Sequence, residues 1–401
     1  YHGALFSGRM DYPNKHARPP QVYQQWTRPC SGMELLSSQH FPERFQGNLL
    51  VLNVIGYQGI LMYKLRDEGA SIVGEENVRL LSSSDPNFRP SDIKIGPGGA
   101  IYFCDWHNPI IGHMQHNLRD PNRNRTHGRV YRITYEGRPL SQKVKIDGEE
   151  SARLFELLQH PEERVRYHTR KELACRPSSE VLKLVSEWAG TNDEKLLEAL
   201  WLHQAHHQVN PVLLQKCLAS NIPQVRAAAI RVLSHWRDSY KNTSHSSSSS
   251  DSQETRQATP DTQTSIKEGE LYANIKKSHS NASPADFSGH AEILSILHRH
   301  ANDQDPRVRL EVARAASFLD VPEAIEIPLL VHASRYGSDK YIEFVCQETR
   351  KTLEPRWKSS LARGHQFRMQ TSLGKEFLVK NMSTPALLKR ERDALVCREL
   401  L

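Results

Sequence analysis

The segment PSDIKIGPGGAIYFCDW (residues 90–106) contains two short apolar runs joined by glycine and proline. Isoleucine, tyrosine and phenylalanine favour a pleated strand, and the Gly-Pro-Gly-Gly sequence between the runs favours a tight turn. The segment therefore predicts a β-hairpin. Similar runs precede it in GNLLVLNVIG (residues 47–56) and GILMYKL (residues 59–65), and another follows it in GRVYRITYEGR (residues 128–138).

A succession of antiparallel hairpins is typical of the blades of a β-propeller. We expect one nearly complete blade over residues 30–84 and most of a second over residues 90–137. Residues 1–140 are thus predicted to be the C-terminal blades of an incomplete propeller. Two blades cannot close a ring without leaving unpaired edges, so we expect further blades upstream and interpret the chain as a fragment.

From about residue 150 the spacing of the apolar residues becomes that of an amphipathic helix, and Leu154, Leu157 and Leu158 fall on one helix face. Three segments share a proline near the helix start, a Val-Arg pair and an apolar face: PEERVRYHTRKEL, IPQVRAAAIRVLSHW and QDPRVRLEVARAASFL. The repeat arginine is expected to reach an acid or a helix C-terminus of the neighbouring repeat. The equivalent apolar positions, including two degenerate copies, are Val165, Leu196, Val225, Val308 and Ile342.

Outside one long gap these positions recur about every thirty residues, which predicts an α-helical HEAT-repeat solenoid, an armadillo-like helical array. We expect repeats over residues 150–237 and again over residues 289–401, where the last repeat is truncated. The gap, residues 238–288, contains SHSSSSSDSQETRQATPDTQTS. Such a serine- and threonine-rich segment buries too little apolar surface to fold, so it is predicted to be disordered.

The bulk composition excludes several classes of function. The net charge is +7, but the basic residues are dispersed among 46 acidic ones, so we expect no nucleic-acid partner. The sequence has no stretch of 18 apolar residues, so no membrane span is predicted. The six cysteines form no CxxC or CxxCH pattern, so no haem site of the c type is expected in this chain.

The densest polar segment is DWHNPIIGHMQHNLRDPNRNRTHGR (residues 105–129), in the loop after a predicted strand. One interpretation is a substrate or metal site, because neutral imidazole is a common metal ligand. The alternative is an ordered loop held by side-chain hydrogen bonds. The histidine spacing matches no recognised metal motif, so no metal site is assigned firmly. The candidate residues are Asp105, His107, His113, His116 and Arg119.

Three further positions are candidates for ligand contacts. Arg89, at the start of a predicted strand, could clamp an anion in a propeller channel or pair with a neighbouring aspartate. Trp26 and Thr27 precede the first predicted strand, and the tryptophan could stack on a planar cofactor or pack in the hub. In the helical part, WLHQAHHQ (residues 201–208) offers histidines but no completed ligand set, so an exposed helical face is expected there.

The runs PCSGMELLSSQHFPERFQGNLLVLNVIGYQGILMYKL and DPNFRPSDIKIGPGGAIYFCDWHNPIIGHMQHNLRDPNRNRTHGRVYRITYEGRPL resemble planctomycete-type membrane-bound dehydrogenases. Members of this family are exported proteins with a sugar-dehydrogenase-like propeller, HEAT repeats and usually a C-terminal CxxCH haem domain. The resemblance implies a periplasmic or cell-envelope location. It also implies use of pyrroloquinoline quinone (PQQ) and calcium by the complete parent protein.

The propeller part is more distantly similar to soluble aldose dehydrogenases. In that comparison Arg89 matches the first of two arginines that contact the quinone, and Ser91 replaces the second. Trp26 and Thr27 correspond to a Trp-Thr pair of the cofactor pocket, whereas Tyr57 stands near the position of a cofactor-contacting lysine. The resemblance places the catalytic histidine upstream of this chain, so no catalytic residue is assigned here.

Two functions follow as expectations. The first is part of an exported PQQ-type sugar or aldose dehydrogenase whose HEAT solenoid docks a protein partner. The alternative is a non-catalytic propeller and HEAT protein that binds a polysaccharide or a protein.

Overall fold

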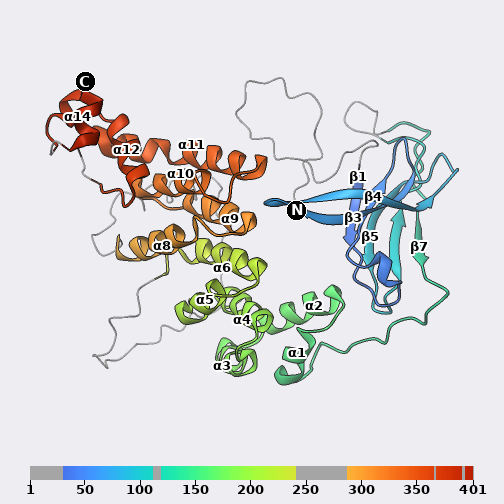
Figure 1. The fold of residues 1–401 in the computed structure, drawn as a ribbon. Coiled ribbons are helices and arrows are strands. Elements are labelled where there is room, and N and C mark those ends of the chain that lie inside the picture. Colours follow the sequence, from blue (N-terminus) through green and yellow to red (C-terminus); the bar gives the residue numbers. More distant parts are fainter. Residues whose placement is uncertain (1–29, 112–118, 241–286, 365–366, 391–392, 401) are drawn as a thin grey trace, which may run out of the picture.

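The computed structural model describes residues 30–111, 119–240, 287–364, 367–390 and 393–400 (Figure 1). Within these ranges two antiparallel β-sheets are followed by a helical region, as the sequence predicts. The first sheet has the strand order β1 (Cys30–Leu35), β2 (Leu49–Asn53), β3 (Gly59–Glu68) and β4 (Ser71–Ser82). The second has the order β5 (Pro90–Ile95), β6 (Ile101–Asp105) and β7 (Arg129–Ile133).

The two sheets share one hydrophobic core. Along β6, Ile101 and Phe103 are buried while Tyr102 and Cys104 between them are exposed, which is the alternation expected of a strand with one buried face. Strands β1 and β5 lie next to each other, and Gly32 permits this approach because a Cβ atom there would lie 3.1 Å from the Cα of Asp92. The core residues contributed by the strands include Leu50, Leu52, Ile60, Met62, Ile93 and Phe103.

Because each strand runs antiparallel to its neighbour, the connections fall at two opposite ends of the sheets. The connections at residues 54–58, 83–89 and 106–128 lie at one end, here called the loop end. The connections at residues 36–48, 69–70 and 96–100 lie at the other, here called the helix end. A short 3-10 helix, η1 (Glu43–Phe45), lies within the first of these.

Most helices of the helical region follow one another as pairs (Figure 1). The pairs begin with α1 (Ser151–Leu157) and α2 (Glu163–Ala174), α3 (Ser178–Ala189) and α4 (Asp193–Ala205), and α5 (Pro211–Leu218) and α6 (Pro223–Trp236). They continue with α8 (Phe287–His300) and α9 (Pro306–Ala316), then α10 (Glu326–His332), preceded by η4 (Pro322–Ile325), and α11 (Lys340–Ala362). The last helices are α12 (Ser372–Lys380), α13 (Thr384–Leu387) and α14 (Ala394–Leu400).

The repeat identified in the sequence marks the second helix of each pair. Each of the five repeat positions, from Val165 to Ile342, is buried near the start of such a helix. Successive second helices contact one another, from α2 through α4, α6 and α9 to α11. Pro223 and Pro306 occupy the first turns of α6 and α9, where a missing N–H costs no helical hydrogen bond.

Two of the three Val-Arg arginines join consecutive helix pairs as expected, whereas Arg166 of α2 donates to the carbonyl oxygens of His160 and Pro161 within its own pair. Arg226 of α6 donates two hydrogen bonds to Asp303, at 2.9 and 2.8 Å, in the turn before α9. Arg309 of α9 donates to the carbonyl oxygens of Asp303 and, at 3.0 Å, of Gly337 before α11. The arginines therefore satisfy loop carbonyls and acids between neighbouring pairs.

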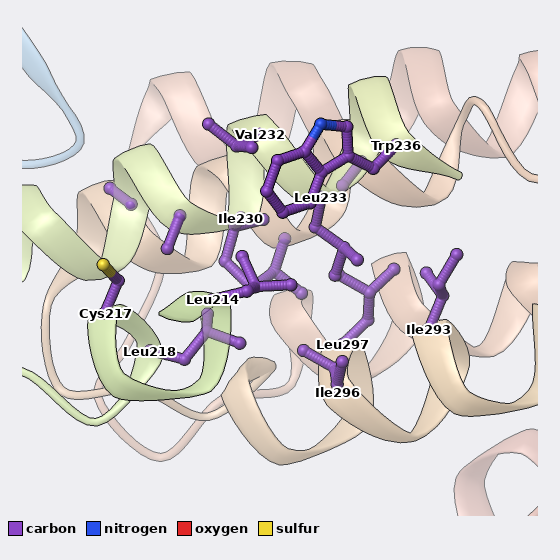
Figure 2. Packing of buried hydrophobic residues seen from close by; sticks show 14 of the residues in the cluster. Leu214, Cys217, Leu218, Ile230, Val232, Leu233, Trp236, Ile293, Ile296 and Leu297 are labelled. Carbon is purple, nitrogen blue, oxygen red and sulfur yellow. The ribbon is translucent and has the colours of Figure 1, made fainter. Parts of the chain in front are cut away.

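The helices on both sides of residues 241–286 belong to one core (Figure 2). Leu214 of α5 and Leu233 and Trp236 of α6 are buried together with Ile293 and Leu297 of α8. The predicted disordered segment lies almost wholly outside the described residues. Its predicted start at 238 is too early, because Tyr240 is 2% exposed and its hydroxyl lies 3.5 Å from Glu292. The apolar body of this tyrosine extends the core beyond α6.

The sheets dock on the helices through their helix end. Glu162, before α2, is 1% exposed and accepts hydrogen bonds from the N–H of Gln39 at 3.1 Å and the hydroxyl of Ser141 at 2.9 Å. The N–H of Glu163 donates to the hydroxyl of Ser37. These contacts fix the first helix pair against the sheets.

A second contact is made by the β3–β4 arm, the part of this hairpin that extends beyond β2 (Figure 1). At its tip, the N–H of Ala70 donates to Asp339 Oδ2 at 2.6 Å, and Ala70 is buried in the helical core. Gly69 has φ +56°, and a Cβ atom there would lie 2.0 Å from Asp339 Oδ2. Arg307 and Lys340 form ion pairs with Asp67 and Glu68 of the arm.

None of the helices in the described ranges has the length and apolar character needed to cross a membrane.

Replacing Asp339 with alanine tests the docking of the arm. The carboxylate also accepts from the N–H groups of Tyr341 and Ile342 in the first turn of α11. Loss of an N-cap costs about 0.5–2 kcal/mol, and an unpaired buried N–H adds about 1–3 kcal/mol. We expect Asp339→Ala to lower the free energy of unfolding in urea by about 2 kcal/mol or more.

The control is Asp320→Ala, because Asp320 is 73% exposed and pairs only at the surface with Arg356. Its free energy of unfolding should stay within about 0.5 kcal/mol of the wild-type value. Equal values for the two variants would contradict a structural role for the arm contact.

Candidate functional site

The loop end gathers several of the residues selected from the sequence. Arg89, Asp105 and His107 lie there together, and Arg119 is an exposed residue of the same 106–128 connection. Trp26, Thr27, His113 and His116 lie outside the described residues. Within the described ranges, no cluster of three or more His, Cys, Asp or Glu side chains could hold a metal ion.

Arg89 is an internal link between two loops. It is 9% exposed, and its Nε and Nη1 atoms donate at 3.0 Å to the carbonyl oxygens of Asn108 and Val54, respectively. Its Nη2 atom lies 3.5 Å from the carbonyl oxygen of Pro109. Burial lowers the pKa of this guanidinium from its ordinary value. The side chain thus connects the 54–58 and 106–128 loops.

Asp105 organises the same loops from the end of β6. Its carboxylate is fully buried, and Oδ1 accepts from the N–H of Arg89 at 2.7 Å and of His107 at 2.8 Å. Oδ2 accepts from Arg129 Nη1 at 3.2 Å. These bonds correspond to the interpretation of the polar segment as an ordered loop held by side chains. Gln58 adds three bonds to carbonyl oxygens of the 83–89 loop.

His107 is held in an unusual backbone conformation beside an acid. Its φ of +46° lies in the left-handed region, which is sparsely populated by residues other than glycine and often occurs at functional sites. Its Nδ1 atom is buried, lies 3.7 Å from Asp85 Oδ2, and has no hydrogen-bond partner among the described residues. At 3.7 Å this is an electrostatic contact and not a hydrogen bond.

The charge on Asp85 is stabilised by its surroundings. The N–H of Asn87 donates to Oδ1 at 2.8 Å and is the main cause of a lowered pKa of this carboxyl. Arg129 donates to Oδ2 at 3.2 Å and adds to the effect. An ionised carboxylate therefore faces the imidazole of His107, an arrangement suited to orienting a histidine that accepts a proton.

An open groove of about 560 Å³ lies beside these groups, at the ends of β5, β6 and β7. Trp106 lines it and its side chain is 44% exposed. The backbone N–H of Trp106 donates to the carbonyl oxygen of Arg89 at 2.9 Å, which fixes the position of this residue. An exposed aromatic face beside a few fixed polar groups suits a ligand with both apolar and hydroxyl-bearing surfaces. The other main lining residues are Ser91, Cys104, Asp105, His127 and Arg129.

Trp106 and Arg129 are not among the candidates selected from the sequence, although both lie within the quoted polar segment. The sequence signal for Trp106 is its place directly after a predicted strand that ends in an acid. The role of Arg129 becomes visible only in the three-dimensional structure, where it bridges Asp85 of the 83–89 loop and Asp105 at the end of β6.

The histidine-rich segment of α4 differs from the expectation of an exposed face. His203 and His206 are 7% and 8% exposed. His206 has its ring nitrogens within 3.0 Å of the Ser178 hydroxyl and 3.1 Å of the Leu173 carbonyl oxygen, so it joins three helices. The turn that ends α4 directs these rings back into the helix stack, which the local sequence does not reveal.

One family model, described as a domain of unknown function (DUF7133), matches residues 7–137. The match includes all seven described strands and the loop end, and it stops before the helices. No curated protein and no solved structure gives a significant match.

Substitution of Arg89 tests whether this side chain is a structural link. Arg89→Ala leaves three buried or partly buried carbonyl oxygens without this donor. Each such loss costs about 1–3 kcal/mol, so we expect the free energy of unfolding to fall by about 3 kcal/mol without any ligand present. Urea unfolding measured by tryptophan fluorescence provides the test.

Arg66→Ala serves as the control, since Arg66 is 56% exposed and pairs with Glu68 at the surface. We expect a change within about 0.5 kcal/mol for this variant. An Arg89→Ala protein as stable as wild type would mean that the guanidinium is available to a ligand.

Proposed function

We propose that the two sheets are adjacent C-terminal blades of a β-propeller and that the helix pairs form a HEAT-type solenoid. Two observations support this assignment. The first sheet is a four-stranded meander, and its first strand, β1, lies against β5, the first strand of the second sheet. The helix pairs repeat a buried apolar position, and in α6 and α9 the arginine that follows it reaches the next pair.

We further propose that the loop end binds a sugar, in an exported protein of the sugar-dehydrogenase type located in the periplasm or cell envelope. The observation that carries this proposal is the open groove with Trp106 exposed beside Arg129 and His127. Sugars combine an apolar ring face with hydroxyl groups, and such a face packs well on an indole ring.

The charges around the groove favour a neutral ligand. Arg129 is paired with both Asp85 and Asp105, so its charge is already compensated. The hydroxyl groups of a sugar can accept hydrogen bonds from His127 and Ser91, or donate to them, without a charge on the ligand. In this proposal the helical region docks a protein partner, because the sheets contact it through the end opposite to the groove.

Removal of the Trp106 side chain should weaken sugar binding. Loss of ring stacking is worth about 0.5–1.5 kcal/mol, which corresponds to roughly two- to tenfold in affinity. We expect Trp106→Ala to show this loss in calorimetric titrations with aldohexoses and their oligomers.

Tyr102→Ala is the matched control, because Tyr102 is a 36% exposed aromatic residue at the helix end of β6, the strand that precedes Trp106. Its sugar affinity should equal that of wild type. Absence of any sugar binding by the wild-type chain, or equal affinities for all three proteins, would contradict the proposal.

A second candidate function is oxidation of the bound sugar, favoured by the ionised Asp85 facing the His107 imidazole. This pair could accept the proton of a sugar hydroxyl. The quinone contact that the family resemblance implies for Arg89 does not fit the observed geometry, because its guanidinium is buried against backbone carbonyl oxygens. No step through PQQ or calcium is therefore derived.

Addition of PQQ and calcium distinguishes the two functions. If the chain only binds sugar, we expect that adding PQQ and calcium changes neither the midpoint temperature of thermal unfolding nor the absorbance of the quinone. A shift that disappears in His107→Ala, with Arg79→Ala as an unaffected control on the exposed part of β4, would make oxidation the favoured function.

A further inference from the structure

We propose that a groove beside the C-terminal half of α11 binds an acidic, partly apolar peptide segment of a protein partner. This inference rests on the proposed role of the helical region as a docking surface. It names the site and the chemistry of the partner. The groove has a volume of about 410 Å³ and lies between α11, η4 and α12.

The floor of the groove is apolar. Trp357 of α11 is 6% exposed, Ile325 of η4 is 1% exposed, and both line the groove with the partly buried Phe377 of α12. The rings of Trp357 and Phe377 meet edge to face with their centres 5.3 Å apart. A small apolar side chain of a partner can therefore pack on this floor.

The rim of the groove is basic. Arg350, Lys351 and Lys358 line it together with a single acid, Glu354. Lys351 pairs with Glu348 at 2.7 Å and Lys358 pairs with Glu354, whereas Arg350 is exposed and has no ion pair among the described residues. The positive charge of Arg350 is therefore not compensated by a neighbouring acid of the described ranges and is complementary to a carboxylate-bearing ligand.

The buried indole provides an independent sign of a missing partner. Trp357 Nε1 is buried and donates to no acceptor in the described part of the chain. An indole N–H usually finds an acceptor when it is buried. Because this nitrogen is buried, neighbouring side chains must move aside before a carbonyl or carboxylate oxygen of the partner can accept from it.

The spacing of these groups sets the form of the ligand. Arg350 and Trp357 are seven residues apart on α11, which is about two helical turns or ~10 Å. One carboxylate near Arg350 and another near Trp357 and Lys358 fit a segment of a few residues with an apolar residue between its acids. A peptide of alternating leucine and glutamate has these properties.

The test uses the full chain and a dye-labelled peptide of alternating leucine and glutamate, with binding followed by fluorescence anisotropy. We expect a dissociation constant on the order of micromolar that weakens as salt is added. A peptide with glutamine in place of glutamate should bind at least tenfold more weakly.

Two changes at the groove should weaken binding to different extents. The double variant Arg350→Glu and Lys358→Glu reverses two exposed charges and should lower affinity at least thirtyfold. Trp357→Phe keeps an aromatic ring but removes the N–H, and should lower affinity about three- to tenfold. The matched control is Lys216→Glu, an exposed lysine of α5, which should bind as wild type does.

The outcomes separate this site from the sugar-binding proposal. Trp106→Ala should leave peptide affinity unchanged, so either proposal can fail while the other stands. Peptide binding that the groove variants do not weaken would keep the helical region as a docking surface but overturn the groove. Equal binding of the glutamine peptide, or no binding to wild type, would also overturn it.

Discussion

The attachment of the sheets to the helices through two carboxylates sets the arrangement of the whole chain. Glu162 accepts hydrogen bonds from the connection after β1, and Asp339 accepts from the tip of the β3–β4 arm. Asp339 simultaneously caps α11, so helix formation and arm docking depend on one side chain. Because both contacts use the helix end of the sheets, the loop end with its groove points away from this attachment.

The loop end is held by buried polar groups in addition to the hydrophobic core, which includes Phe88 of the 83–89 connection. Placing a guanidinium and a carboxylate in a protein interior is unfavourable unless they are hydrogen-bonded. Arg89 and Asp105 meet this condition through backbone groups of neighbouring loops. The result is a set of fixed loops on which Trp106 is exposed and His107 faces Asp85. Such preorganisation suits a binding site, since little conformational freedom remains to be lost when a ligand binds.

The helical region combines rigidity between pairs with variation on its surface. Buried apolar positions and inter-pair arginines recur along it, whereas the residues that line the groove beside α11 are not repeat positions. In such stacked repeats each unit contacts mainly its neighbours, so a surface feature of one unit can change without disturbing the others. This property explains how one pair can carry a basic groove with an unpaired indole N–H.

The sequence by itself determined the order of β and α structure and the positions of the repeats. The spacing of apolar residues, every second residue in a strand and every three to four in a helix, indicates which face of the element is buried. This pattern can be recognised within a short stretch of sequence. That is why the strand at residues 101–105 and the buried positions Val165, Val225 and Val308 follow directly from the pattern. The polar segment after β6 was likewise recognisable, because so many ionisable residues in one loop are unusual.

Only the tertiary structure decided what these polar residues contact. Arg89 looked suited either to an anion or to a neighbouring aspartate, but its side-chain partners are carbonyl oxygens of residues such as Val54, far away in the sequence. Arg129 bridges an acid of the 83–89 loop and an acid at the end of β6, and His206 is buried by a turn that directs it toward α2 and α3. Hydrogen-bond partners are set by the distances that folding creates between distant segments, and residue types alone do not encode those distances.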